Sequence, residues 1–204
     1  MTPKSPREAW QAMLDGNHRF VTGELAHPRQ DIDRREALAE KQTPFAALFG
    51  CADSRLSAEI IFDVGLGDFF VVRNAGQVIG ETILGSLEYA VEVLGVPIIL
   101  VLGHDECGAI RATINDVEGN MNASGEYIHK LVAQIRPTVL AANAQGKHEI
   151  DDVTELHVQD TINEMLTSSS LIAEAVKSGK LAVVGANYKL TLGEIHPIVT
   201  IGLD

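Results

Sequence analysis

The sequence has little of three features that would place it in other classes of protein. Only two of its 204 residues are cysteine, Cys51 and Cys107, so a framework of several disulfide bonds is excluded. It has 16 basic against 28 acidic residues, a net charge of −12, which argues against nucleic acid or an anionic membrane as a partner. No apolar run approaches the roughly 20 residues of a membrane span, and the first residues lack the apolar core of a signal peptide. We therefore expect a cytoplasmic protein with reduced thiols and a single domain over residues 1–204.

Short apolar runs bounded by glycine, proline or polar residues are the main indication of the fold. Such runs are typical of buried parallel strands, and they cover residues 44–50, 69–73, 98–102 and 181–185. Apolar residues at helical spacing connect the second run to the third and end at Gly95, so these segments form a strand–helix–strand unit with a right-handed crossover. The sequence therefore predicts an α/β fold with a central, mostly parallel sheet flanked by helices.

Later segments are expected to complete this fold. Helices are predicted from Cys107 onward, over 126–145 with a kink or break at Pro137, and over 151–178 with an interruption at 167–170. Two short segments, 188–190 and 198–201, predict a final pair of strands, which we interpret as antiparallel.

Residues 1–43 precede the first predicted strand and indicate an N-terminal helical arm. Ser5, Pro6 and Glu8 have the pattern of a helix start with a capping box. Apolar residues then follow at helical spacing, and the segment 15–17 should weaken the helix near its end. A short helix is expected around 34–41. Because the arm has an apolar face of its own, we expect it to pack outside the central sheet and to serve dimer packing.

Three residues that suit a soft metal ion follow two of the predicted strands. Cys51 follows the first strand, and His104 and Cys107, an H-x-x-C pair, follow the third. Because the carboxyl ends of parallel strands meet at one edge of a sheet, these residues can converge. Thiolate sulfur and imidazole nitrogen bind zinc, and a catalytic zinc has three protein ligands and a fourth position for water. The sequence predicts one zinc ion per chain.

Residues near these ligands suggest how such a site would work. Asp53 has two possible roles: fourth ligand in a closed site, or hydrogen-bond acceptor from a metal-bound water in an open one. Arg55 is placed to form a two-pronged pair with Asp53 and so to favour the open site. Leu56 and the strands would supply an apolar pocket for a small uncharged substrate. The amide of Gly108, at a helix start, could donate to a developing oxyanion.

The chain resembles the β-class carbonic anhydrases in four stretches, which are Cys-Ala-Asp-Ser-Arg at 51–55, Phe-Val-Val-Arg-Asn-Ala-Gly at 70–76, Leu-Glu-Tyr-Ala-Val at 87–91 and Gly-His-Asp-Glu-Cys-Gly at 103–108. The resemblance implies zinc held by Cys51, His104 and Cys107, with an Asp53–Arg55 pair beside the fourth position. It implies reversible hydration of carbon dioxide to bicarbonate and a proton by a zinc-bound hydroxide. It also implies a homodimer, often paired into a dimer of dimers, in which Tyr89 lines the pocket of the neighbouring subunit.

The same resemblance bears on regulation. A bicarbonate-inhibited subgroup of the family has a tryptophan three residues before its first zinc cysteine, where this chain has Leu48. Arg73 and Tyr188 match the other two members of that anion site, so the set is incomplete. We therefore expect no cooperative inhibition by bicarbonate.

Two other functions remain open on sequence grounds. One is hydrolysis of a related heterocumulene, carbon disulfide or carbonyl sulfide, with the same zinc. The other is a non-catalytic module that responds to bicarbonate or carbon dioxide and holds a closed structural zinc. A thiol redox protein is disfavoured because the two cysteines lack C-x-x-C spacing. The remaining histidines have no metal-like spacing and are interpreted as surface or structural residues: His18, His27, His129, His148, His157 and His196.

Overall fold

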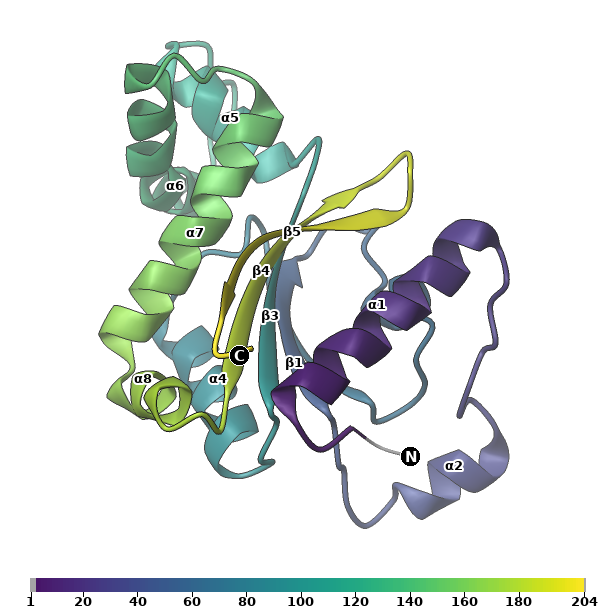
Figure 1. Ribbon diagram of the computed structural model, residues 1–204. Helices are drawn as coiled ribbons and strands as arrows, with labels where there is room; N and C mark the ends of the chain where they lie inside the picture. The colour runs from purple at the N-terminus through teal and green to yellow at the C-terminus, as the bar shows by residue number, and fades with distance from the viewer. Residues whose placement is uncertain (1–2, 204) are drawn as a thin grey trace.

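One five-stranded sheet forms the centre of the protein, which we describe from a computed structural model over residues 3–203 (Figure 1). The strands lie in the order β2-β1-β3-β4-β5. The first four are parallel and β5 is antiparallel to β4, so the predicted α/β fold with a mostly parallel sheet is confirmed. Their bounds are β1 Ala46–Cys51, β2 Phe69–Asn74, β3 Ile98–His104, β4 Ala182–Lys189 and β5 Glu194–Ile201.

The apolar character of the central strands follows from burial on both faces. Every residue of β1 and β3 is buried, which is why these strands show continuous apolar runs instead of alternation. In their parallel pairing Gly50 lies opposite Leu102, so Cys51 and Gly103 come next at the same edge of the sheet. The register thus brings the ends of both predicted ligand-bearing strands together.

The end of the sheet differs from the sequence prediction. Segments 181–185 and 188–190 belong to one strand, β4, and the prediction of a break between them was wrong. Gly185 lies within the strand and does not end it. The residue is glycine because a helix packs against the strand at this point, and a Cβ there would lie 2.7 Å from the Val158 side chain. Asn187 is tolerated in the buried strand because its amide donates to Asp151 Oδ1. The antiparallel final strand is confirmed.

Helices cover both faces of the sheet (Figure 1). On one face lie α1 Pro6–Thr22 and α3 Ala58–Ile61, and on the other lie α4 Glu81–Glu92, α7 Ile150–Ser168 and α8 Ser170–Lys177. The helices α5 Gly108–Val117 and α6 Glu126–Ala144 pack on each other and on α7. Of the kink or break predicted at Pro137, the break is wrong: α6 continues through it, with buried residues on either side, among them Ile135 and Val139. The predicted interruption of the last long helix is confirmed at Ser169, which caps α8.

The N-terminal helix packs on the sheet of its own chain. The capping box at Ser5 and Glu8 is confirmed. The expectation that the arm lies outside the central sheet was wrong, since Ala9 and Met13 of α1 are fully buried in the core beneath it. The helix also continues through Gly16, where a Cβ would lie 1.8 Å from the Phe62 carbonyl oxygen. That glycine permits a close helix contact and does not mark the end of the helix.

The segment after α1 is held to the core by two buried carboxylates. Asp63 accepts hydrogen bonds from Arg19 and from the amides of Ala26 and His27. Asp68 pairs with two arginines at the start of α2 Ile32–Ala37 and just before it. This helix begins and ends earlier than the predicted 34–41. No helix among residues 3–203 is both long and apolar enough to cross a membrane.

Candidate metal centre

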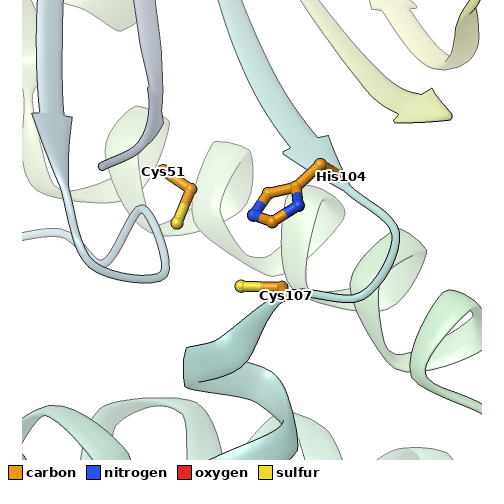
Figure 2. A group of neighbouring side chains, drawn as sticks. All are labelled: Cys51, His104 and Cys107. Carbon is orange, nitrogen blue, oxygen red and sulfur yellow. The ribbon is translucent and has the colours of Figure 1, made fainter. Parts of the chain in front are cut away.

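Three side chains converge at the carboxyl edge of the sheet (Figure 2). Cys51 is the last residue of β1, His104 is the last residue of β3, and Cys107 is the N-cap of α5. The two sulfurs and an imidazole nitrogen lie within 4.8 Å of one another, and all three residues are buried. The parallel register brings Cys51 to His104, although 53 positions separate them in the sequence, and a tight turn from β3 into α5 adds Cys107.

The imidazole of His104 is oriented by its own loop. Its Nδ1 donates to the Asp105 carbonyl oxygen at 2.7 Å, which leaves Nε2 with a lone pair. Nε2 is buried and has no hydrogen-bond partner within residues 3–203. An unpaired buried nitrogen is costly unless something else binds it, and metal-ligating histidines characteristically donate their other nitrogen in this way. The His104 geometry therefore fits a metal ligand.

The two thiols influence each other's ionisation. The interaction with Cys107 lowers the pKa of the Cys51 thiol, and the Gly76 amide, which donates to the Cys51 sulfur, contributes to this lowering. Conversely, donation to the Cys51 thiolate and burial raise the pKa of Cys107 far above its usual range. A soft divalent ion between them would allow both to ionise, so the donor set fits zinc.

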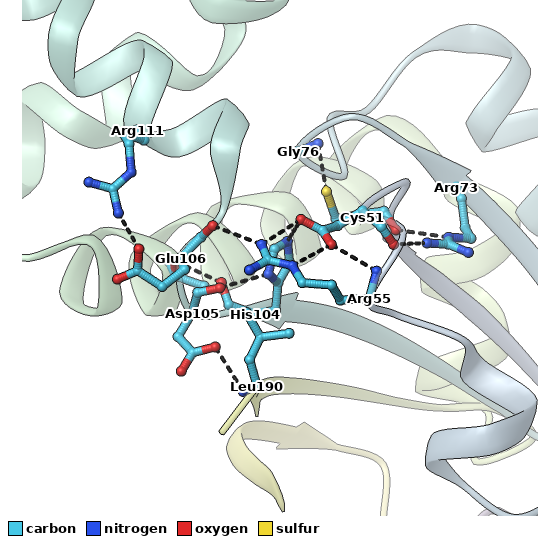
Figure 3. A network of polar contacts seen from close by, with 11 residues as sticks. Cys51, Arg55, Arg73, Gly76, His104, Asp105, Glu106, Arg111 and Leu190 are labelled. Carbon is cyan, nitrogen blue, oxygen red and sulfur yellow. Dashed lines mark hydrogen bonds and ion pairs between the residues drawn. The ribbon is translucent and has the colours of Figure 1, made fainter. Parts of the chain in front are cut away.

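A carboxylate, that of Asp53, lies beside these candidate ligands and is held by the guanidinium group of Arg55, which Figure 3 shows close to His104. Asp53 Oδ2 is 4.0 Å from His104 Nε2. Arg55 donates to both Asp53 oxygens through Nε and Nη2, and its backbone amide donates to Oδ1. These hydrogen bonds hold the pKa of Asp53 well below its usual range. The carboxylate is therefore ionised and engaged by Arg55, the arrangement expected of an open site.

The other residues predicted for the site lie in different surroundings. Leu56 is buried in the core on the α1 side of the sheet. Gly108 is the first residue of α5, next to Cys107, and the space around its Cβ position is open within 4 Å. Tyr89 lies on α4, 44% exposed, with its ring 6.0 Å from that of Phe70. Because one chain is described, the contact of Tyr89 with a neighbouring subunit stays a prediction.

Three contributors to this region were not assigned this place from the sequence. Arg73 donates to the carbonyl oxygens of Cys51 and Asp53, at 2.8 and 2.6 Å, and so holds the loop after β1. The Gly76 amide donates to the Cys51 sulfur at 3.4 Å. His157 of α7 is buried against Gly76, whereas the other histidines outside the centre are exposed. Local sequence carries no signal for these contacts, since each one joins separate elements.

Comparison with known proteins gives a consistent result. A family model described as "Carbonic anhydrase" matches residues 46–195. "Carbonic anhydrase 2" of Mycobacterium tuberculosis is 47% identical over 193 residues, covering 95% of this chain and 93% of that protein. A carbonic anhydrase of Mycolicibacterium smegmatis is 45% identical over 196 residues, covering 96% and 95%.

Solved structures show the same architecture. A β-carbonic anhydrase of Coccomyxa, solved with acetazolamide, superposes with a TM-score of 0.73 at 25% identity, covering 93% of this chain and 86% of that one. A structure from a study of two tetrameric β-carbonic anhydrases of Sordaria macrospora gives a TM-score of 0.74 at 22% identity, covering 94% and 98%. The second similarity concerns the fold alone.

Proposed function

This chain belongs to the β-class carbonic anhydrases, and from that premise we propose how it hydrates carbon dioxide to bicarbonate and a proton. We propose that zinc is held by Cys51, His104 and Cys107, one ion per chain. The observation that carries this assignment is the unpaired, buried Nε2 of His104 beside two thiols. Zinc bound there would lower the pKa of a coordinated water toward neutrality and so supply a nucleophile.

The chain's own groups would orient the reaction. Asp53 is ionised, so it can only accept hydrogen bonds, and we assign it the role of fixing a water or hydroxyl proton near the ligands. Arg55 keeps the carboxylate from turning toward His104 Nε2. The Gly108 amide, at the start of α5, would donate to a developing oxyanion. Leu56, in the core on the α1 side of the sheet, is not assigned to the substrate pocket.

The arrangement of Asp53 also bears on the non-catalytic alternative. A closed structural zinc requires four fixed ligands, and Asp53 would be the fourth. Its two oxygens are instead paired with Arg55. This pairing favours an enzyme over a closed binding module.

Assembly and location complete the proposal. We propose that the enzyme acts in the cytoplasm, because its two cysteines are free thiols, as expected of a reducing compartment. We propose a homodimer or a dimer of dimers, with residues 1–43 contributing to dimer packing and Tyr89 lining the pocket of the neighbouring subunit. The exposure of Tyr89 in the single chain is consistent with this placement.

Metal analysis combined with stopped-flow hydration of carbon dioxide tests the proposal. We expect about one zinc per chain in the purified protein, and loss of both metal and hydration activity in the Cys107→Ala variant. The His148→Ala variant, altered at an exposed histidine outside the centre, should retain both. Carbon disulfide and carbonyl sulfide belong in the same assay, and turnover of either in place of carbon dioxide would contradict the proposal. Full hydration activity in metal-free Cys107→Ala would refute the zinc assignment.

A further inference from the structure

The helix α7 carries none of the three proposed ligands, yet a buried polar face of this helix contacts the end of β3, which carries His104, and the loop after β2, which donates to Cys51. Thr154, His157 and Thr161 recur at helical spacing and are at most 5% exposed. His157 Nε2 lies 2.7 Å from the Gly76 carbonyl oxygen. The two threonine hydroxyls lie 3.5 Å from the carbonyl oxygens of His104 and Gln77. Each side chain thus touches the backbone of a segment at the metal centre.

Among these contacts the one made by His157 is the strongest. A threonine hydroxyl has one proton, and both threonines direct it to a carbonyl of α7 itself, at 2.8 and 2.7 Å. Their 3.5 Å contacts are therefore secondary. A carbonyl oxygen only accepts, so His157 Nε2 carries the proton and donates it to Gly76. Burial lowers the pKa of His157, which keeps the imidazole neutral at pH 7 with a single N–H.

Gly76, which accepts this hydrogen bond, also donates one to the proposed ligand Cys51. The Gly76 amide donates to Cys51 Sγ, and its carbonyl accepts from His157, so both polar groups of one residue are fixed (Figure 3 shows the first bond). Gly76 has φ +76° and Gln77 has φ +38°, so two successive residues are in the left-handed region. Glycine adopts this region without strain, whereas the backbone of Gln77 is strained there. The side chain of Asn74 closes the same loop onto Val78. Such a loop needs outside contacts to keep its conformation.

The other nitrogen of the imidazole has no comparable contact. His157 Nδ1 has no hydrogen-bond partner among residues 3–203, although it is buried. His157 lines a cavity of about 40 Å³ together with Thr138 and Asp160, which has room for one water molecule. Within the part of the chain that the structure describes, the ring therefore makes one direct hydrogen bond, to Gly76. Burying a histidine in this way is costly, and that bond is the interaction that offsets the cost.

We propose that His157 is a positioning residue of the metal centre: it fixes the Gly76 carbonyl and thereby keeps the Gly76 amide on the Cys51 sulfur. An N–H donor at a thiolate draws charge from the sulfur and orients it, so this contact adjusts both the retention and the electronic character of the metal. The inference rests on the proposed function, because it requires a metal bound by Cys51.

Substitutions of His157 that differ in their ability to donate to Gly76 distinguish a positioning role from a packing role. In His157→Gln the side-chain amide can still reach Gly76, whereas the shorter Asn and the apolar Leu cannot donate there. Ile162→Ala is the matched control, because Ile162 is a buried residue of α7 that packs near Gly185 and makes no polar contact with the metal loops. Two readouts apply: the rate of zinc transfer to a chelator, and the thiolate-to-metal charge-transfer absorption of the cobalt(II)-substituted protein.

We expect His157→Asn and His157→Leu to release zinc about 10- to 100-fold faster than the parent and to shift the cobalt absorption. His157→Gln should stay close to the parent in both measurements. Ile162→Ala should lower the thermal midpoint without shifting the cobalt absorption. The Asn variant keeps a polar side chain, so it serves as the test if the Leu variant does not fold.

The result that would refute the proposed function differs from the results that would refute the role of His157. A parent protein that binds neither zinc nor cobalt would refute the proposed function itself. A parent that binds both, with a His157→Asn variant that shows the parental release rate and absorption, would refute the role of His157 alone. Equal acceleration of metal release in His157→Asn and Ile162→Ala, with no change in absorption, would likewise assign His157 to packing.

Discussion

Arg55 donates hydrogen bonds to both carboxylate oxygens of Asp53, with Nε 2.8 Å from Oδ1 and Nη2 2.7 Å from Oδ2. This pair forms within one short loop, and Arg55 Nη2 also donates to the Glu106 carbonyl oxygen, one residue before Cys107. The guanidinium group therefore connects the loop after β1 with the loop after β3. It leaves the Asp53 carboxylate close to the three proposed ligands but paired with the Arg55 guanidinium group.

Replacement of Arg55 by alanine should lower hydration activity without releasing the metal. In Arg55→Ala the carboxylate loses its two-pronged partner, and we expect stopped-flow hydration to fall by about 10- to 100-fold, the usual effect of losing an orienting group around a metal site. At pH 7 Asp53 would still be ionised, since an ordinary aspartate has a pKa of about 4. The effect is therefore one of position. Zinc content should be unchanged.

Arg111→Ala is the control for that variant. Arg111 pairs with the exposed Glu106 side chain and makes no contact with Asp53, so its loss should leave the rate near that of the parent. If Arg55→Ala retained the full hydration rate, the proposed role of Arg55 in positioning the Asp53 carboxylate would be wrong.

The hydration rate should rise with pH through one ionisation. Arg55 depresses the pKa of Asp53 in the folded protein, so the stabilisation from this pair is complete above the ordinary carboxyl pKa and is lost only as pH falls through the lowered value. Asp53 therefore does not titrate across pH of about 6 to 9, and the profile should report the nucleophile that the metal generates near pH 7. Asp53→Asn should lower the plateau and keep the shape. A flat profile in the parent would contradict this account.

Bicarbonate should inhibit the enzyme without cooperativity. Leu48 is buried and has no donor where the regulated subgroup has an indole N–H, and Arg73 already donates to the carbonyl oxygens of Cys51 and Asp53. One missing hydrogen bond to an anion weakens binding by roughly 1.5–3 kcal/mol. The measurement is hydration rate against added bicarbonate at fixed pH, corrected for the reverse reaction. A sigmoidal curve that Arg73→Ala abolishes would show that the anion site is intact.

Two helical glycines should respond to alanine in opposite ways. In Gly16→Ala the new Cβ meets the Phe62 carbonyl oxygen at 1.8 Å, so we expect a loss of about 3 kcal/mol or more in the free energy of unfolding. Gly85 of α4 has open space around its Cβ position, and Gly85→Ala should gain about 0.4–1 kcal/mol. Urea denaturation of both variants measures the difference. A neutral Gly16→Ala would mean that α1 does not approach α3 so closely.

Sequence reasoning was most successful where chemistry and pattern are local. The apolar runs that became β1 and β3 are continuous because both faces of these strands are buried, and that property is visible in the residues themselves. The rule that parallel strands end at one edge then brought Cys51 toward His104. The capping box at Ser5 was predictable for the same reason, since its partners are three residues apart.

Predictions from the sequence were wrong where the role of a residue depends on which element packs against it. Gly16 and Gly185 look like interruptions in the sequence, but each admits a neighbouring element that the chain contacts only after folding. Pro137 resembles a helix break, and the helix is nevertheless continuous because tertiary contacts hold it.

The proposed ligand types, the strands that carry them and the family of the chain are all evident from residue types and local patterns. That α1 covers its own sheet and that His157 reaches Gly76 became evident only in the folded chain. The physical reason is the same in each case. Residue type fixes which bonds a side chain can make, whereas the packing of separate elements fixes which partner comes within hydrogen-bonding distance.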